Sequence, residues 1–116
     1  MRAIRVRPGE QPVIIDLPKG FREIQKEVGG LFALVSLEDR VDAFANDEGI
    51  ILGMPFNIML PTGDAGHEVP ICGPVVVLAS DDEGESIGLT EEQAAKWLSV
   101  LAAASRVYVE QPEIPF

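Results

Sequence analysis

Apolar and polar residues alternate along several short stretches of the chain, which is the pattern of β-strands with one buried face. Other short stretches are apolar throughout and end at turn residues, as strands in the middle of a sheet do. These two patterns predict strands at Ala3–Arg7, Gln11–Leu17, Leu31–Leu37, Val41–Ala45, Ile50–Leu52 and Cys72–Ala79. Pro8-Gly9 and Asn46–Gly49 lie between consecutive strands and predict tight turns.

Two other segments follow the helical period. In Phe21–Val28 the apolar residues form one stripe over two turns, and Gly29 with Gly30 predicts a left-handed cap at the end of this helix. A second helix is predicted at Glu91–Ala104, with one apolar face made of Ala94, Trp97, Leu98, Leu101 and Ser105.

The start of the second helix has a recognisable signature. Thr90 and Gln93 have the spacing of a capping box, in which each side chain bonds the main chain of the other residue. Leu89 precedes the cap and is placed to pack on Ala94.

The remaining segments predict irregular structure. Gly53–Leu60 is apolar but interrupted by a proline and an asparagine, which predicts a bend with one helical turn. Pro61–Glu68 predicts a loop, and Ser80–Gly88 an acidic loop. Residues 106–116 predict either an edge strand, at Val107–Val109, or a loosely ordered tail.

The order of these segments predicts an α+β fold, in which a mixed, mostly antiparallel sheet of about five strands carries two helices. The 116 residues have the size of one domain, 1–116, with no linker or internal repeat.

The charge of the chain is strongly asymmetric. Residues 1–27 carry six basic and four acidic side chains, whereas the rest carries three basic and fifteen acidic ones, and the formal net charge is −10. A field of this sign repels phosphate backbones, so direct binding of nucleic acid is not expected. No apolar run is long enough to span a bilayer, and the single cysteine excludes an internal disulfide, so we expect a cytoplasmic protein without membrane contact.

The sequence offers little chemistry. Cys72 and His67 are the only nucleophile and base that could pair, and no third group orients them, so Cys72 is expected to be buried and unreactive. The acidic run 81–85 lacks the ligand spacing of a calcium loop. Gly29-Gly30 precedes a strand rather than opening a helix, which does not suit phosphate binding. We therefore expect no enzyme activity, metal or cofactor.

Carboxylates at two places are the candidate contacts for a partner protein with a basic surface. Asp81, Asp82, Glu83 and Glu85 lie in the acidic loop, and Asp47 and Glu48 lie at a predicted hairpin tip. Asn57 is a further candidate because a polar amide inside an apolar run must find partners. It bonds main-chain groups in one interpretation and contacts a ligand or partner in the other.

Four motifs carry a resemblance to a known family. In order along the chain they are Val28-Gly29-Gly30, Asn46-Asp47-Glu48-Gly49, Gly53-Met54-Pro55-Phe56-Asn57 and Gly73-Pro74-Val75-Val76-Val77. With their spacing, they resemble the small bacterial, plasmid and phage proteins of the family catalogued as domain of unknown function 3846. The resemblance extends to about Ala79. It implies a small α+β fold associated with mobile genetic elements, and it implies no catalytic residue.

Three functions remain compatible with these observations. The first is a non-enzymatic, acidic interaction protein of a phage, plasmid or bacterial host. The second is an inhibitor that mimics DNA, which requires the carboxylates to line one face. The third is a small ligand-binding or enzymatic domain built on residues 53–72, which requires Asn57, Asp64 and His67 to meet in one pocket.

Overall fold

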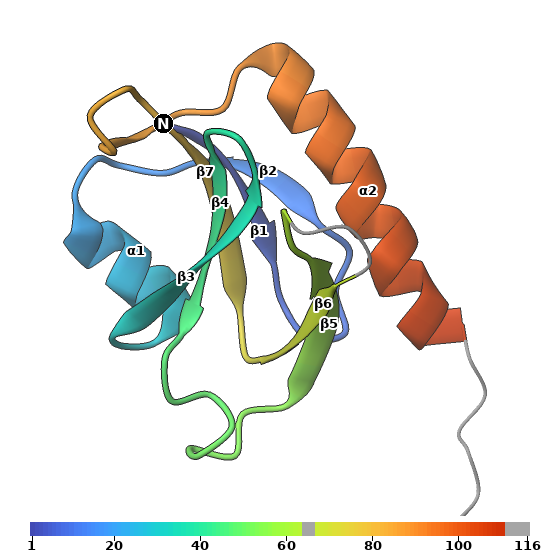
Figure 1. Cartoon of the computed structure of the whole chain (residues 1–116). Helices are drawn as coiled ribbons and strands as arrows, with labels where there is room; N and C mark the ends of the chain where they lie inside the picture. Colours follow the sequence, from blue (N-terminus) through green and yellow to red (C-terminus); the bar gives the residue numbers. More distant parts are fainter. Residues whose placement is uncertain (64–66, 111–116) are drawn as a thin grey trace, which may run out of the picture.

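The computed structural model describes residues 1–63 and 67–110 of the chain, the last five of them as backbone only. It confirms the α+β class, with eight strands and two helices in the described ranges (Figure 1). The elements in order are β1 Arg2–Val6, β2 Val13–Asp16, α1 Phe21–Val28, β3 Phe32–Glu38, β4 Val41–Asn46, β5 Phe56–Pro61, β6 Glu68–Cys72, β7 Val75–Ser80, β8 Ser86–Ile87 and α2 Glu91–Glu110.

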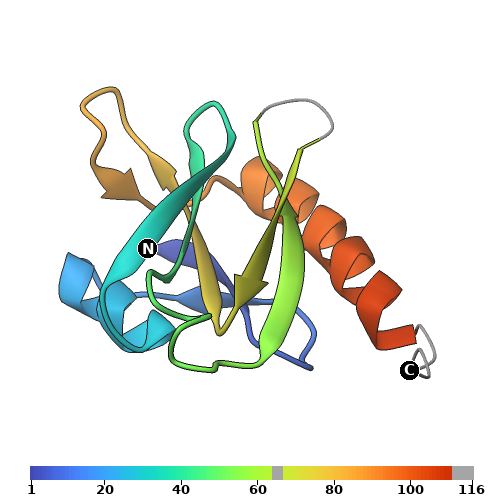
Figure 2. The same ribbon diagram turned by 60° about the horizontal axis from the view of Figure 1, so that its bottom comes forward.

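The main sheet has the strand order β2-β1-β7-β4-β3, and each pair of neighbours is antiparallel. The short strand β8 also pairs with β7, whereas β5 and β6 form a separate hairpin (Figure 2). Strand β7 lies at the centre, and Val75 to Ala79 are all buried because elements cover both faces of the sheet. This explains why β7 is apolar throughout rather than alternating.

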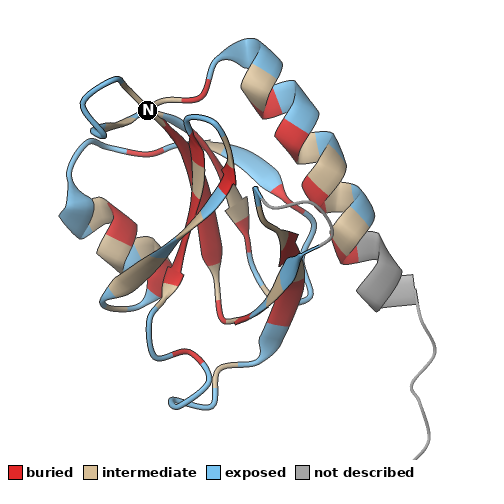
Figure 3. Cartoon of the chain, in the orientation of Figure 1, coloured by how far each residue is buried: buried red, intermediate tan, exposed pale blue. Residues whose placement is uncertain are grey.

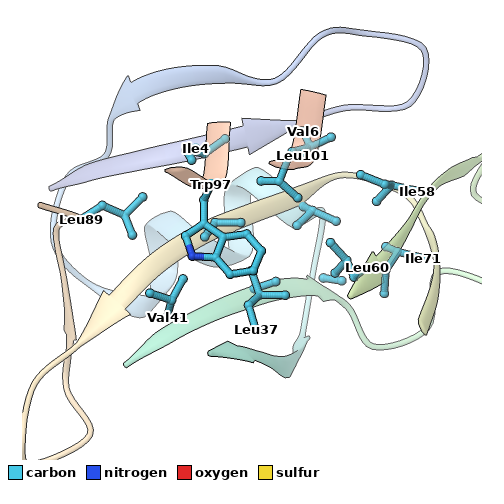
Figure 4. Packing of buried hydrophobic residues seen from close by; sticks show 14 of the residues in the cluster. Ile4, Val6, Leu37, Val41, Ile58, Leu60, Ile71, Leu89, Trp97 and Leu101 are labelled. Atoms are coloured by element: carbon cyan, nitrogen blue, oxygen red, sulfur yellow. The ribbon is translucent and has the colours of Figure 1, made fainter. Parts of the chain in front are cut away.

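One face of the main sheet is covered by α2 and the β5–β6 hairpin, and these elements enclose the larger of two apolar clusters. Trp97 of α2 lies inside this cluster, near Leu37 and Val41 of the sheet (Figure 4). Its indole N–H donates a hydrogen bond to Glu38, which also accepts one from Lys96 at 2.7 Å. These two hydrogen bonds hold the pKa of Glu38 below its ordinary value.

The other face is covered in part by α1, which buries Ile24 and Val28 against a second cluster that includes Phe44 and Val76. A two-fold hydrogen-bonded ion pair ties this helix to β1, because the Arg5 guanidinium donates to Glu27 at 2.9 and 2.6 Å. α1 ends as predicted, with Gly29 in the left-handed conformation at φ 82°.

Glu27→Gln should lower the free energy of unfolding near pH 7 by about 1.5–3 kcal/mol, the usual range for a hydrogen bond to a charged group. The hydrogen bond from Arg5 lowers the pKa of Glu27. The contribution of Glu27 is therefore present above its unfolded-state pKa and lost as pH falls through the folded-state pKa. Urea titrations from pH 7 to pH 3 should show a weaker loss of stability on acidification in the variant. An unchanged pH dependence would show that the pair contributes nothing.

The capping box of α2 is confirmed. The Thr90 N–H donates to the Gln93 side chain at 2.9 Å, and the Gln93 N–H donates to the Thr90 hydroxyl at 3.0 Å. Leu89 and Ala94 are both buried beside it. Neither helix in the described part of the chain combines the length and apolar character that a membrane crossing requires.

Three predicted segments were wrong. Residues 50–52 form turns rather than a return strand, since the Leu52 N–H donates to the Glu48 carbonyl at 2.8 Å. Residues 53–60 contain no helical turn, and most of them belong to β5. The predicted loop 61–68 begins with the last residue of β5 and ends with the first residue of β6, a strand that was not predicted. β5 and β6 pair only with each other, so each strand has one unpaired edge. Proline lacks an N–H and is tolerated in such edge strands, which explains Pro61 and Pro70.

The C-terminal segment was also wrong as far as it is described. α2 continues to Glu110, past the predicted end at Ala104, so Val107–Val109 are helical and offer no strand edge. A long helix of good helix formers is favoured once its apolar face is buried on a sheet. The rest of the predicted tail, 111–116, lies outside the described residues.

Candidate functional site

An exposed loop of aliphatic residues connects β4 to β5. We call residues 47–54 the apolar loop. Ile50, Ile51 and Leu52 follow one another in it and are 70%, 81% and 59% exposed. The loop extends from one end of the sheet, and Figure 3 shows most of it coloured as exposed. Single exposed aliphatic residues are common, but three in succession form a patch of the kind found at interaction sites.

The apolar loop is held by its own main-chain hydrogen bonds. The N–H of Leu52 donates to the Glu48 carbonyl at 2.8 Å, and the N–H of Met54 donates to the Gly49 carbonyl at 2.9 Å. A third bond, 3.1 Å long, joins the Gly53 N–H to the Ile50 carbonyl. The loop therefore has a defined shape and presents its aliphatic side chains from a fixed backbone.

Asn46 joins the base of the apolar loop to the end of α1. Its side-chain NH₂ donates to the Val28 carbonyl at 3.1 Å, and its side-chain oxygen accepts from the Glu48 N–H at 2.8 Å. Leu31 adds a main-chain bond, because its carbonyl accepts from the Asp47 N–H at 2.9 Å. Because Gly30 has no side chain, its backbone can lie close to this amide. A Cβ there would be 3.3 Å from the Asn46 nitrogen.

The end of β6 forms the other support of the loop. Gly49 is buried and packs so closely on the Cys72 carbonyl that a Cβ would overlap that oxygen. The Gly73 N–H donates to the Pro55 carbonyl at 2.8 Å. Gly73 has φ 92°, and a Cβ there would lie 2.6 Å from the Met54 sulfur. Glycine is required at Gly49 because the Cys72 backbone approaches it directly, and at Gly73 because the backbone has a positive φ and the Met54 side chain packs against it.

Asn57 is a structural residue. It is buried, and its NH₂ group donates to the Val6 carbonyl at 2.9 Å and to the Gly73 carbonyl at 2.8 Å. These bonds join β5 to β1 and to the turn between β6 and β7. Of the two interpretations of Asn57, the structure supports main-chain bonding, because both amide hydrogens are engaged inside the fold.

Residues from all four resemblance motifs thus meet at one place. The glycines after α1, the Asn46–Gly49 turn, the Met54–Asn57 segment and Gly73 are far apart in sequence, yet together they hold the apolar loop. The sequence interpretation missed the loop because it assigned Ile50–Leu52 to a strand. The available signal was the glycine on each side of three aliphatic residues, which leaves a segment at the lower limit of strand length.

Gly49→Ala should lower the free energy of unfolding by about 1–3 kcal/mol, because an added methyl group in a tightly packed site forces the backbone to shift. The expected shift separates the apolar loop from Cys72. Urea unfolding measures the loss of stability, and faster hydrogen exchange at the Leu52 and Met54 amides reports the displacement of the loop. Gly53→Ala is the matched control, since its Cβ would meet no atom within 4 Å although its φ of 70° adds local strain. Equal effects from both variants would contradict the close packing at Gly49.

A cavity of about 400 Å³ lies between the apolar loop and β6, lined by residues 46–51 and 70–72. Cys72 lines this cavity and is half-buried, so the prediction of a buried thiol was wrong. The reason is that Cys72 ends an outer hairpin instead of beginning the central strand. His67 is exposed and precedes the other end of β6, roughly 16 Å from Cys72 by strand geometry. Cys72 and His67 therefore do not form a pair.

The acidic loop lies at the opposite end of the molecule. In the β4–β7 register, Ala45 beside the apolar loop faces Val75, whereas Val41 faces Ala79, next to the acidic loop (Figure 1). Asp81 stabilises this loop by accepting from the Glu83 and Glu85 amides, both at 2.9 Å. Asp82 forms an ion pair with Arg40, and Glu83 and Glu85 are exposed.

The proposed contact residues are therefore divided among three places. Asp47 and Glu48 belong to the apolar loop, Asp81 to Glu85 lie at the far end, and Asn57 is internal. Carboxylates at both ends do not favour a DNA mimic, which needs one charged face. The pocket of Asn57, Asp64 and His67 is not supported either, since Asn57 is engaged and Asp64 lies outside the described residues. In the described ranges, no three His, Cys, Asp or Glu side chains are grouped as metal ligands.

Comparisons with known proteins agree with the motifs. A family model described as a domain of unknown function, DUF3846, matches residues 1–102. The match continues past Ala79 and into α2, so it includes the whole main sheet and both supports of the apolar loop. No curated protein and no solved structure matches the chain significantly. Since the family model spans most of the 116 residues, the chain belongs to the DUF3846 family.

Proposed function

We propose that this protein is a non-enzymatic, acidic interaction protein of a phage, plasmid or bacterial host, and that it docks on a partner protein through the apolar loop. The observation that supports this most is the exposure of Ile50, Ile51 and Leu52 on a loop that four separate sequence motifs hold in place. A loop with fixed backbone loses little conformational entropy on binding, so more of its apolar burial contributes to affinity.

The charge around the apolar loop indicates the chemistry of the partner. Asp47 and Glu48 are exposed beside the aliphatic residues, and the whole chain carries a formal charge of −10. The complementary surface is an apolar pocket with lysine or arginine at its rim. In such an interface the aliphatic side chains supply most of the affinity, whereas the charges mainly raise the association rate.

The same charge argues against two other occupants of this surface. A second copy of the chain would bring the carboxylates of both loops together and add the repulsion of two molecules of charge −10. A bacterial membrane rich in anionic lipid would repel Asp47 and Glu48 as the aliphatic residues approached it.

The test uses the triple variant Ile50→Ser, Ile51→Ser, Leu52→Ser as bait beside the unaltered protein, in lysate of the source organism. A matched control, Val13→Ser with Ile14→Ser, removes aliphatic residues that are 45% and 49% exposed at β2. We expect one protein to bind the unaltered and control baits but not the triple variant. After purification, this protein should bind the triple variant at least 30-fold more weakly, which corresponds to the roughly 2 kcal/mol of an interface hot spot.

Several outcomes would contradict the proposal. Loss of binding in the β2 control as well as in the triple variant would place the interface elsewhere or indicate non-specific adhesion. A loop-dependent dimer in analytical ultracentrifugation would make a second copy the occupant. Loop-dependent flotation with phosphatidylglycerol vesicles would make the partner a membrane.

A further inference from the structure

A groove on the α1 side of the main sheet reaches from Phe32, which pairs with Asn46 beside the apolar loop, to the acidic loop at the other end of the molecule. The helix has eight residues and is about 12 Å long, whereas the six-residue strands below it span about 20 Å, so α1 covers only part of this face. The uncovered part forms a cavity of about 340 Å³. We call it the α1-side groove.

The groove has an apolar floor and an acidic end. Its apolar residues come from α1, β3 and β4, namely Phe21, Ile24, Phe32, Leu34 and Phe44. Phe32 and Phe44 contact each other edge to face, with ring centroids 5.1 Å apart. Phe21 and Leu34 are 61% and 55% exposed, so apolar surface remains open to a ligand.

Two carboxylates line the acidic end, Asp42 from β4 and Glu85 from the acidic loop. Asp42 is half-buried, and this burial raises its pKa although a hydrogen bond with Ser80 lowers it. A carboxylate that has lost water gains more from a cationic partner than an exposed one does. Among the described residues that line the groove, the cation is the ammonium of Met1, and Asp16 already pairs with it at 3.1 Å.

We propose that the α1-side groove binds an arginine side chain, together with an adjacent apolar side chain, from a peptide segment of a partner protein. The guanidinium would lie at the acidic end against Asp42 and Glu85, and the apolar side chain would contact Leu34 and the phenylalanine rings. Arginine suits this site better than lysine because its planar group both pairs with carboxylates and stacks on aromatic rings.

The size and charge of the groove restrict the occupant. Its volume is at the low end of ligand cavities, about 300–1,000 Å³, so it accommodates a few side chains rather than a helix or strand with its full surface. Nucleic acid would be repelled by the acidic loop. The chain's own residues after Arg106 carry no basic side chain, so they cannot supply the cation.

The test is a titration of the ¹⁵N-labelled full chain with acetyl-Leu-Arg-Leu-amide, followed by amide chemical shifts. Acetyl-Leu-Gln-Leu-amide is the matched neutral peptide. We expect the arginine peptide to shift the amides of Leu34, Asp42, Phe44 and Glu85, and to bind at least fivefold more tightly than the glutamine peptide. Asp42→Asn, which keeps the shape of the side chain, should weaken binding of the arginine peptide at least fivefold.

Two further variants separate this site from the apolar loop. Leu34→Ser changes an exposed side chain and should weaken binding without unfolding the protein, whereas Ile51→Ser should leave it unchanged. Equal binding of both peptides, or an Asp42→Asn variant that binds as tightly as the original, would overturn the proposal. Chemical-shift changes confined to the apolar loop would overturn it as well. So would groove amides that shift when the protein alone is concentrated, because a second copy of the chain would then occupy the groove.

Discussion

Trp97→Ala should lower the free energy of unfolding by about 3–5 kcal/mol, the usual cost of removing a large buried aromatic side chain. Trp97 is 5% exposed inside the larger apolar cluster, and its N–H bonds Glu38 of β3. Lys96 lies 5.5 Å from the Trp97 ring centroid and bonds the same carboxylate. This one region of α2 therefore provides apolar packing and two hydrogen bonds to the sheet.

The measurement is urea unfolding followed by circular dichroism, because the only tryptophan of the chain is the residue replaced. Trp97→Phe is the control: it keeps most of the apolar volume and loses the N–H, so about 1–3 kcal/mol should be lost. If Trp97→Ala cost less than 1 kcal/mol, α2 would not be anchored through this side chain.

Asn57→Leu should lower the free energy of unfolding by about 2–5 kcal/mol. Leucine has the same number and branching of side-chain heavy atoms but donates no hydrogen bond, so the Val6 and Gly73 carbonyls lose their side-chain donor in a buried site. Each buried polar group left unpaired costs about 1–3 kcal/mol. The same variant should loosen the apolar loop, because Gly73 supports it through Pro55.

Met59→Leu is the matched control, since it replaces a half-buried residue of the same strand with one of similar volume. A change of this kind usually costs less than about 1.5 kcal/mol. Equal stability of Asn57→Leu and the original chain would show that the Asn57 amide does not hold β5 to β1.

Local patterns were sufficient for much of the fold. The period of Phe21–Val28, the Thr90–Gln93 capping box and the all-apolar β7 each depend on residues close in sequence, and all three are confirmed. The β5–β6 hairpin was missed because its prolines are unfavourable in most strands. The residues within these two strands do not indicate that each strand pairs with only one other strand, which is the arrangement that tolerates proline.

The candidate site depends on contacts between distant segments, which sequence patterns do not report. Gly49 could be recognised as a turn glycine, but its packing on Cys72 joins residues 23 positions apart. Asn57 shows the same limit, because its amide could be assigned to main-chain or partner contacts only after Val6 and Gly73 were located beside it. The exposure of Ile50 to Leu52 depends on these long-range contacts, because they fix the backbone of the loop outside the sheet.

Photo-crosslinking from position 51 tests the docking of the apolar loop most directly. Benzoylphenylalanine replaces Ile51 in one form of the protein and Ile14 in another, and both are irradiated in lysate of the source organism. The proposal predicts a covalent adduct with one distinct protein from position 51, which excess unaltered protein suppresses and excess triple serine variant does not. No adduct from position 51, or the same adducts from positions 51 and 14, would contradict it.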